Sequence, residues 1–310
     1  MLDELVKQPT AMEAFKTYAA NRNGAIIAVN KKRLYNQPFI LNTNSPLADV
    51  PVLSGQQSDT IGMRVSQEGP MVLTHLGAVQ DDEHDNVLVQ LIMNDGQNPV
   101  VLTRSWCHVK TLFGPGGLTY PLPQGLYLDE SRALSATFRE PDTDGNTLAR
   151  ISLAGMKYSK IYQDPDLMRT RKKLEASQYE SMPYFYPLDS QRVVIPAFTQ
   201  VVREIQIDAA HHFLLHQIGR FSDGNFSINI IDMAKGESII NGPSGSNFEV
   251  PDQILCGLDG ASEGYPYRFK EPIMFYANQK IQVTMTNLTD AEIDVYLTFG
   301  GEAFAVRQWS

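Results

Sequence analysis

Short apolar runs separated by polar turn sequences recur along most of the chain, and they predict β-strands. Residues 71–73 (MVL), 87–92 (VLVQLI) and 100–102 (VVL) are typical runs, while 81–85 (DDEHD) and 94–96 (NDG) have the composition of turns. Many short strands without long helices between them indicate an antiparallel sandwich or barrel. The fold class that we expect is therefore all-β.

Two segments depart from this pattern. Residues 2–20 carry apolar positions at mixed three- and four-residue spacing, with Pro9 dividing them, and residues 21–24 (NRNG) end the segment. In the middle of the chain, Asp164 and Pro165 have the types expected at a helix N-terminus, and a basic run follows at 169–173. We interpret these segments as an N-terminal helical arm and as a connection that contains a short helix.

The two halves of the strand region share one apolar pattern. Residues 122–138 align with 269–285 without a gap, so that Leu126 matches Ile273 and Leu134 matches Ile281. The correspondence continues in three further segments: 72–75 with 213–216, 86–91 with 225–230, and 151–155 with 296–300. Alternating apolar positions in strands fill a core between sheets. We infer a duplicated β-sandwich, and one large sandwich without a true repeat is the alternative.

The expected architecture is two tandem antiparallel β-sandwich (jelly-roll-like) domains with a short N-terminal helical arm and a helical linker. The expected boundaries are 1–24 for the arm, 25–160 for the first sandwich, 161–190 for the linker with its short helix, and 191–310 for the second sandwich.

Composition narrows the classes of function. The chain has 26 Lys+Arg against 35 Asp+Glu, a net charge of -9, which argues against a general nucleic-acid binder. No apolar run reaches the ~18 residues of a membrane helix, so we expect no membrane partner, and the N-terminus lacks the features of a signal peptide. Two cysteines, Cys107 and Cys256, cannot form a disulfide framework, which favours folding in a reducing cytoplasm.

Three histidines are the only candidate ligands for the metal of a bicupin-like enzyme. His212 and His216 lie four residues apart on an expected strand and so can face one side, and His75 matches His216 in the repeat. With a carboxylate they would form the metal site of a bicupin-like enzyme. The cupin pattern needs a His-x-His pair, which is absent from this chain. We therefore favour structural histidines and predict no catalytic residue, no metal site and no cofactor.

Residues 142–146 (DTDGN) resemble the opening of a calcium-binding loop, but the closing Glu is missing, and Asp-Gly is typical of tight hairpins. A hairpin is the interpretation that we favour.

Three groups of residues are candidates for contact with partner proteins. The arm either packs on a neighbouring subunit or caps its own domain. The basic run has three possible roles: it binds a phosphate backbone, it binds an acidic patch on a partner, or it is a solvent-exposed helix face. The negative net charge of the chain favours the last two roles. The aromatic group either meets a partner, to which Tyr and Phe offer rigid apolar area, or packs within its own chain. The candidates are Leu5, Phe15 and Tyr18; Arg169, Arg171 and Lys172; and Tyr184, Phe185 and Tyr186.

The second half resembles the β-sandwich structural proteins of tailed-phage virions, of the capsid cement (decoration), head–tail or minor structural type. The resemblance covers residues 192–307 directly and 62–158 through the repeat. It rests on the strand rhythm of segments such as 226–232 (FSINIID) and on Asn-Leu-Thr and Phe-Gly-Gly sequences that we interpret as turns.

This resemblance implies a non-enzymatic, homo-oligomeric protein that is assembled in the host cytoplasm and located in the virion. Its partners would be other virion proteins, either major capsid proteins or portal, neck or tail proteins.

Two rival functions stay open from the sequence. One is the bicupin-like metalloenzyme described above. The other is a carbohydrate- or receptor-binding sandwich, in which exposed aromatics such as Tyr265 and Tyr267 would bind glycans. The chain has only two tryptophans, Trp106 and Trp309, which makes a sugar-stacking platform less favourable.

Overall fold

The computed structural model describes thirteen stretches of the chain. They are residues 36–42, 50–52, 57, 61–64, 71–80, 86–95, 98–114, 119–128, 132–141, 147–158, 181–240, 249–255 and 266–305. The expected arm and most of the expected linker lie outside these residues, and with them Leu5, Phe15, Tyr18, Arg169, Arg171 and Lys172.

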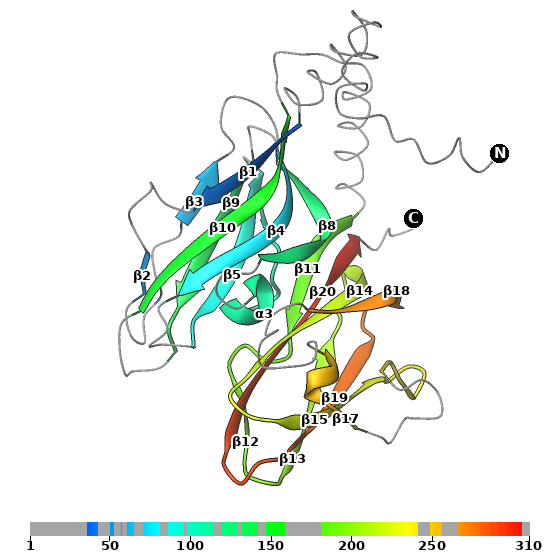
Figure 1. Cartoon of the computed structure of the whole chain (residues 1–310). Coiled ribbons are helices and arrows are strands. Elements are labelled where there is room, and N and C mark those ends of the chain that lie inside the picture. The colour runs from blue at the N-terminus through cyan, green and yellow to red at the C-terminus, as the bar shows by residue number, and fades with distance from the viewer. Residues whose placement is uncertain are drawn as a thin grey trace, which may run out of the picture.

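The first half folds into a sandwich of two antiparallel sheets (Figure 1). One, here called the β4 sheet, has the order β1-β10-β4-β8 with β2 on β10, and the β5 sheet has the order β3-β9-β5-β6 with β7 on β5. A short helix, α3 (Val109–Phe113), follows β7. The strands are β1 (Asn36–Asn42), β2 (Val50–Val52), β3 (Ile61–Arg64), β4 (Met71–Gln80), β5 (Leu88–Asp95), β6 (Asn98–Val101), β7 (Cys107–His108), β8 (Thr119–Leu128), β9 (Arg132–Arg139) and β10 (Thr147–Tyr158).

The second half repeats this arrangement strand for strand. The β14 sheet has the order β11-β20-β14-β18 with β12 on β20, and the β15 sheet has the order β13-β19-β15-β16 with β17 on β15. A 3-10 turn, η2 (Asp252–Leu255), stands in the place of α3. The strands are β11 (Ser181–Pro187), β12 (Val193–Ile195), β13 (Gln200–Gln206), β14 (His211–Ser222), β15 (Phe226–Asp232), β16 (Glu237–Ser238), β17 (Val250–Pro251), β18 (Tyr267–Phe275), β19 (Lys280–Asn287) and β20 (Ile293–Ala305).

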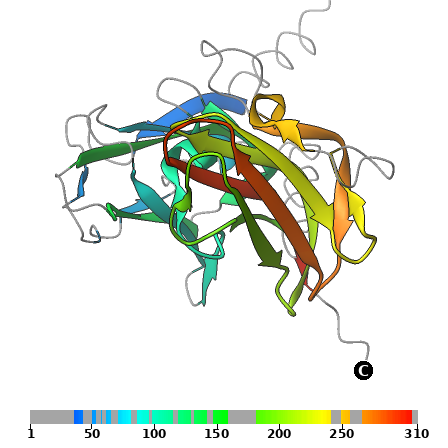
Figure 2. The ribbon, with the colours of Figure 1, turned by 90° about the horizontal axis from the view of Figure 1, so that it is seen from below.

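Each strand of the first half corresponds to the strand of the second half whose label is higher by ten, so that β1 corresponds to β11 and β10 to β20. Corresponding strands have corresponding neighbours in both sheets. Two five-stranded antiparallel sheets whose strands are connected in this order form a jelly roll. The expected fold class, two tandem jelly-roll-like sandwiches, is confirmed, and the two halves have one topology. Figure 2 shows the first sandwich (blue to green) and the second (yellow-green to red) lying side by side.

Each sandwich has its own apolar core. The first contains Leu73, Leu91 and Phe138, and the second contains Phe213, Phe226 and Val283. The alternation seen in the sequence places these side chains inside, as in β19, where every second residue from Ile281 is buried. Burying one such side chain contributes roughly 1.5–3 kcal/mol, so the two cores provide most of the stability of the fold.

The same β-bulge occurs in both halves. Leu73 and Leu215 are fully buried, and in each case the next residue, Thr74 or His216, is skipped by both neighbouring strands. Thr74 therefore corresponds to His216, and the expected match of His75 with His216 is wrong by one residue. The expected alignment of 151–155 with 296–300 is also wrong by one residue. Gly155 pairs with Leu73 in the first half and Gly301 pairs with Leu215 in the second, so Gly155 corresponds to Gly301 and not to Gly300.

We expected the Phe-Gly-Gly sequence to form a turn, and this was wrong. It lies within β20, opposite the bulge. A Cβ atom on Gly301 would overlap the carbonyl oxygen of Leu214 and lie 2.7 Å from the ring of Phe213. Glycine at this position permits the close approach of two backbones. The Asn-Leu-Thr sequence does form the expected turn, between β19 and β20.

The second sandwich begins before the expected boundary at residue 191. β11 pairs with β20 from Ser181 to Pro187, so it is the first strand of the second sandwich and not part of the linker. This strand contains Pro183 and Pro187, although proline cannot donate to a strand ladder. β11 is an edge strand, where proline is tolerated.

Candidate functional site: the junction between the two jelly rolls

The two jelly rolls meet where α3 and β8 of the first lie against β14, β20 and β11 of the second (Figure 1). The approach is close because β14 has a glycine there: a Cβ atom on Gly219 would overlap the backbone carbonyl of Thr111. The Thr111 Oγ1 lies 2.6 Å from the Thr298 Oγ1, so the two hydroxyls share a buried hydrogen bond. The outer face of the β14 sheet is thus covered by the first jelly roll.

A buried histidine forms the centre of an aromatic stack in this junction. The ring of His108 lies parallel to that of Phe221, with centroids 4.5 Å apart, and 4.3 Å from that of Tyr296. The His108 Nδ1 accepts a hydrogen bond from the backbone N–H of Lys110 (3.2 Å), and so caps α3. The Tyr296 hydroxyl donates to the Asn86 Oδ1 in the first jelly roll (3.1 Å). Helix capping and docking of the two halves therefore depend on the same side chain.

A polar strip borders the aromatic stack. The Gln217 Nε2 donates to the carbonyl of Pro121 (3.2 Å), and Arg268 donates to the carbonyl of Leu122 (3.2 Å). The Arg268 Nε also donates to the Gln217 Oε1 (3.3 Å), which links the two contacts. Gln217 is buried and Arg268 is exposed, so the strip is a partly buried network, and its satisfied hydrogen bonds favour one arrangement of the two halves.

Strand β11 connects the two cores directly. The backbone N–H of Phe185 donates to Leu102 (2.9 Å), that of Arg104 donates to Phe185 (2.9 Å), and the Phe185 side chain is 2% exposed and lies in the first core. The next residue, Tyr186, points to the opposite side and is buried in the second core. The aromatic group at 184–186 thus packs within its own chain, and Phe185 and Tyr186 have no surface to offer a partner. Tyr184 is half-buried.

The two tyrosines of this group bind one carboxylate. The hydroxyls of Tyr186 and Tyr184 donate to the Asp208 Oδ2 (3.3 and 3.5 Å), and Arg104 of the first jelly roll forms an ion pair with Asp208 (3.3 Å). Burial, followed by the charge of Asp208, raises the pKa of Tyr184 to about 12. Burial likewise raises the pKa of Tyr186 well above its ordinary value. Both phenols therefore stay protonated and act as donors.

The three histidines considered as metal ligands have three different partners. The His75 Nδ1 lies 2.9 Å from the Thr74 hydroxyl, and the His212 Nδ1 accepts from the backbone N–H of Ala277 (3.0 Å). The His216 Nε2 lies 2.8 Å from the Glu302 Oε1. Within the stretches that the structure describes, no three His, Cys, Asp or Glu side chains are placed to hold one metal ion.

Glu302 and Cys107 have shifted pKa values for opposite reasons. Burial acts to raise the pKa of Glu302, but the interactions with His216 and Ser181 outweigh it, and the net shift is downward. The Cys107 thiol is fully buried, which raises its pKa to about 12. Since the thiolate is the nucleophile, this thiol is inert near neutral pH.

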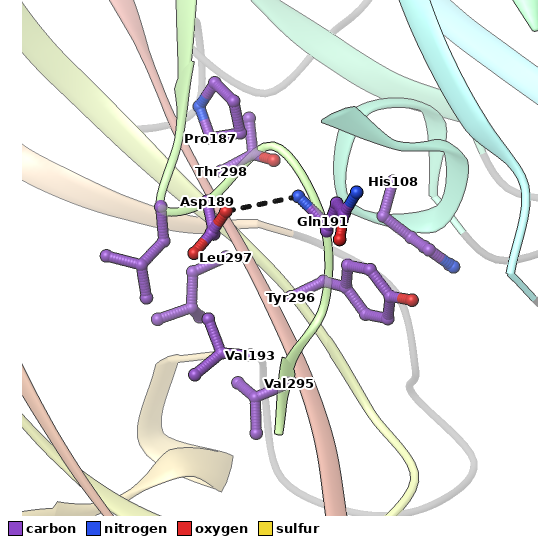
Figure 3. A pocket seen from close by; sticks show the side chains of 10 residues that line it. His108, Pro187, Asp189, Gln191, Val193, Val295, Tyr296, Leu297 and Thr298 are labelled. Atoms are coloured by element: carbon purple, nitrogen blue, oxygen red, sulfur yellow. Dashed lines mark hydrogen bonds between the residues drawn. The ribbon is translucent and has the colours of Figure 1, made fainter. Parts of the chain in front are cut away.

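A small pocket lies beside the junction, between the 187–193 loop, β20 and the start of α3 (Figure 3). Its cavity volume is about 10 Å³, room for about one water molecule, whereas sites for organic ligands usually hold ~300–1,000 Å³. The backbone N–H of Gln191 donates to the Asp189 Oδ1 at its mouth (3.3 Å). The pocket is best understood as a seam between the jelly rolls.

Of the four aromatic residues considered for glycan binding, two can be placed. Tyr267 is half-buried and packs edge-to-face on Phe269, with ring centroids 5.0 Å apart, and Trp106 is also half-buried. Tyr265 and Trp309 lie outside the described residues, as do the 142–146 loop and Cys256.

Comparison with known proteins gives matches only among solved structures. No protein-family model and no curated protein matches the chain. The MCP of STIV (Sulfolobus Turreted Icosahedral Virus) is 8% identical, with 86% of this chain and 97% of that chain covered and a TM-score of 0.40. The major capsid protein P2 from bacteriophage PM2 is 9% identical, with 88% and 99% covered and a TM-score of 0.35.

A third similar structure is PNGase F, a glycosylasparaginase from Flavobacterium meningosepticum. It is 7% identical, with 84% of this chain and 96% of that chain covered and a TM-score of 0.30. At these scores the likeness does not determine a function. By its own strand order, this chain is a tandem jelly roll. Among its described residues, no helix has the length and apolar content needed to cross a membrane.

Sequence reasoning identified the aromatic group of β11 but none of the other residues of the junction. Thr111 and Thr298, which touch, are 187 positions apart, and no local pattern connects them. One signal was present: Gly219 interrupts the strand pattern of residues 211–222, and an isolated glycine in a strand often marks a close approach of another backbone.

Proposed function

We propose that this tandem jelly roll is a non-enzymatic structural subunit of a virus particle. Jelly rolls occur in viral capsid proteins, in lectins and in cupins, so the fold alone does not decide among these classes. The structural role is the one that the details of this chain support best.

The observation that carries the proposal is the junction. It joins the two halves through a glycine contact, a stacked histidine, a polar strip and a side chain shared between cores. These contacts make one rigid block whose outer faces have a fixed relation to each other. A rigid block with fixed faces suits a subunit that must meet its neighbours in the same way at every position.

The rival functions have less support. The candidate histidine ligands of a bicupin-like metal site are bound to three separate partners. For a glycan platform, Tyr267 is committed to an edge-to-face contact with Phe269.

Within a virion, we propose that the protein binds neighbouring capsid or neck and tail subunits of a tailed phage and so stabilises the particle. The resemblance of its second half to cement, head–tail and minor structural proteins supports this finer assignment. Arm residues Leu5, Phe15 and Tyr18 and the basic residues Arg169, Arg171 and Lys172 are the proposed contacts. Such contacts bury on the order of 1,600 Å² in total.

The test is assembly. Purified full-length protein would be analysed by sedimentation velocity and electron microscopy, first alone and then mixed with preformed phage shells and with neck and tail complexes. Self-assembly into shells indicates a main shell subunit, whereas saturable binding to preformed particles indicates a cement or head–tail role. A chain that neither assembles nor co-sediments with any particle would rule out the structural role.

A further inference from the structure

One end of the second jelly roll presents two apolar side chains to solvent. Three loops meet there, residues 196–199, 223–225 and 288–292, here called the tip loops; they lie at the lower end of Figure 1, beyond β12. The backbone N–H of Phe198 donates to Thr289 (3.3 Å), and that of Leu288 donates to Asn225 (3.1 Å). The Phe198 side chain is 69% exposed and that of Leu288 is 52% exposed.

Phe198 has a backbone conformation that a large side chain rarely adopts. Its φ is 52°, and it is the third residue of a turn closed by a hydrogen bond from the Thr199 N–H to the Pro196 carbonyl (3.2 Å). Glycine would fit this position without strain. The chain therefore accepts both backbone strain and an exposed aromatic ring at one residue, and such outliers occur preferentially where they serve a function.

The framework behind the two side chains is rigid. The Asn287 side chain is buried, and its Nδ2 donates to the carbonyls of Ile195 (2.9 Å) and Ala291 (2.7 Å). Its Oδ1 accepts from the Thr289 N–H (2.7 Å). One amide thus ties the turn that carries Phe198 to the loop that carries Leu288. An apolar pair held in a fixed position needs little ordering when a partner binds.

The surroundings of this apolar pair are acidic. The tip loops contain Asp223, Asp290 and Glu292, all exposed, and no Lys or Arg. The nearby Arg192 is bound to Asp294 (3.0 Å). Charge complementarity favours a basic partner that also carries apolar side chains, and it disfavours the anionic surface of a membrane.

This chain contains a segment with both properties. Residues 167–174 (LMRTRKKL) carry four positive charges in five residues, with Leu167, Met168 and Leu174 at the two ends. We propose that the tip loops of one copy bind residues 167–174 of a second copy, with Phe198 and Leu288 as the apolar anchors. This deepens the proposed function by naming one contact between subunits.

The length of the chain favours a second copy over the same copy. Ser181 pairs with Phe304 and Ile195 pairs with Ile293, so the tip lies about 36 Å from Ser181 along β20. Residues 172–174, which hold two of the four basic side chains and the apolar Leu174, lie at most nine residues before Ser181, and nine residues span at most ~32 Å when fully extended. This half of the basic segment cannot reach the tip loops of its own chain, so the segment as a whole can bind only to a second copy.

The first experiment replaces the strained aromatic. In sedimentation-equilibrium measurements on the full chain, Phe198→Gly should weaken self-association at least tenfold, while its melting temperature is unchanged or higher because the turn is relieved of strain. Tyr276→Ala, which removes an exposed aromatic from the opposite end, is the matched control and should leave self-association unchanged. Unchanged self-association of Phe198→Gly, or a wild-type chain that stays monomeric, overturns the proposal.

The second experiment exchanges charges. Asp290→Lys/Glu292→Lys and Arg169→Glu/Arg171→Glu should each weaken self-association about tenfold, and the two pairs combined in one chain should restore it. Lys31→Glu/Lys32→Glu changes the net charge as much as the second pair and should have no effect. Failure of the combined variant to restore association overturns the proposal. Because these measurements use only the purified protein, they are independent of co-sedimentation with particles, and either result can fail without the other.

Discussion

At the scale of single residues, Gly219 sets how closely the two jelly rolls approach. Gly219→Ala would place a methyl group on the Thr111 carbonyl and force α3 away from β14. Overpacking of this kind costs about 2 kcal/mol, so the free energy of unfolding in urea should fall by about that amount. Gly125→Ala is the control, because the new methyl group would lie close only to the Val72 side chain (3.0 Å), which can move, and in ordinary contact with the Leu73 carbonyl (3.6 Å). Equal losses for both variants would contradict the assigned role of Gly219.

The tyrosines on Asp208 make stability depend on pH in the alkaline range. The folded pKa of Tyr184 is about 12, against an ordinary value of 10.0, so the unfolded chain loses its proton first as the pH rises. The stabilisation is complete below about pH 10 and is lost progressively as the pH rises towards the folded value. Unfolding measured in urea from about pH 9 to pH 11 should show a smaller decline for Tyr184→Phe than for the wild type. Equal declines would show that this phenol is not linked to folding.

The sequence was sufficient to identify the aromatic group of β11 as a candidate contact, but it did not show which residues surround this group. Strand alternation implies that Phe185 and Tyr186 point to opposite sides, and they do. It does not reveal that each side is covered by a different core, because that depends on how two distant parts of the chain dock.

At the scale of elements, the bulge in β14 determines how β20 lies against this strand. Gly301→Ala would press a methyl group onto the Leu214 carbonyl and the Phe213 ring, so we expect a loss of about 2–3 kcal/mol. Thermal unfolding followed by calorimetry would measure it. Ala303→Gly, two residues further along the same strand, should cost less, about 1 kcal/mol, since it removes one methyl group and adds no overlap. A larger loss at residue 303 than at 301 would contradict this account of the bulge.

Most elements could be predicted from the sequence, and the errors have physical causes. The apolar alternation of β8, β9, β18 and β19 aligned correctly because no residue is inserted in those strands relative to their counterparts. In β4 and β14 the bulge adds one outward-facing residue after the buried leucine, so matching the two histidines placed the alignment one residue out. The expected linker included β11. Two prolines are unusual in a strand, and the sequence does not show that β11 lies at the edge of its sheet, where proline is tolerated.

At the scale of the whole molecule, the junction should hold the two jelly rolls together without a covalent link. If a protease site is inserted between residues 159 and 180 and cut, the two fragments should co-elute in size-exclusion chromatography at neutral pH. Adding Gln217→Ala and Arg268→Ala removes the polar strip and should increase dissociation at least tenfold. Separation of the fragments without these substitutions would show that the junction is weaker than its contacts indicate.

The duplication was visible in the sequence, but the docking of the copies was not. A repeat shows that two segments share a fold, whereas the contact between Thr111 and Thr298 depends on which outer faces meet. Those faces carry mixed polar and apolar residues, such as Gln217 and Tyr296, and have no pattern that distinguishes them from solvated surface.

Phe185 has a consequence for the order in which the molecule is made. Its ring completes the first core, yet it belongs to a strand that is held by β20, which lies more than 100 residues further along the sequence. While the ribosome is still synthesising the second half, the nascent N-terminal domain has an unfilled place in its interior. Its final consolidation must therefore wait until β20 has been synthesised.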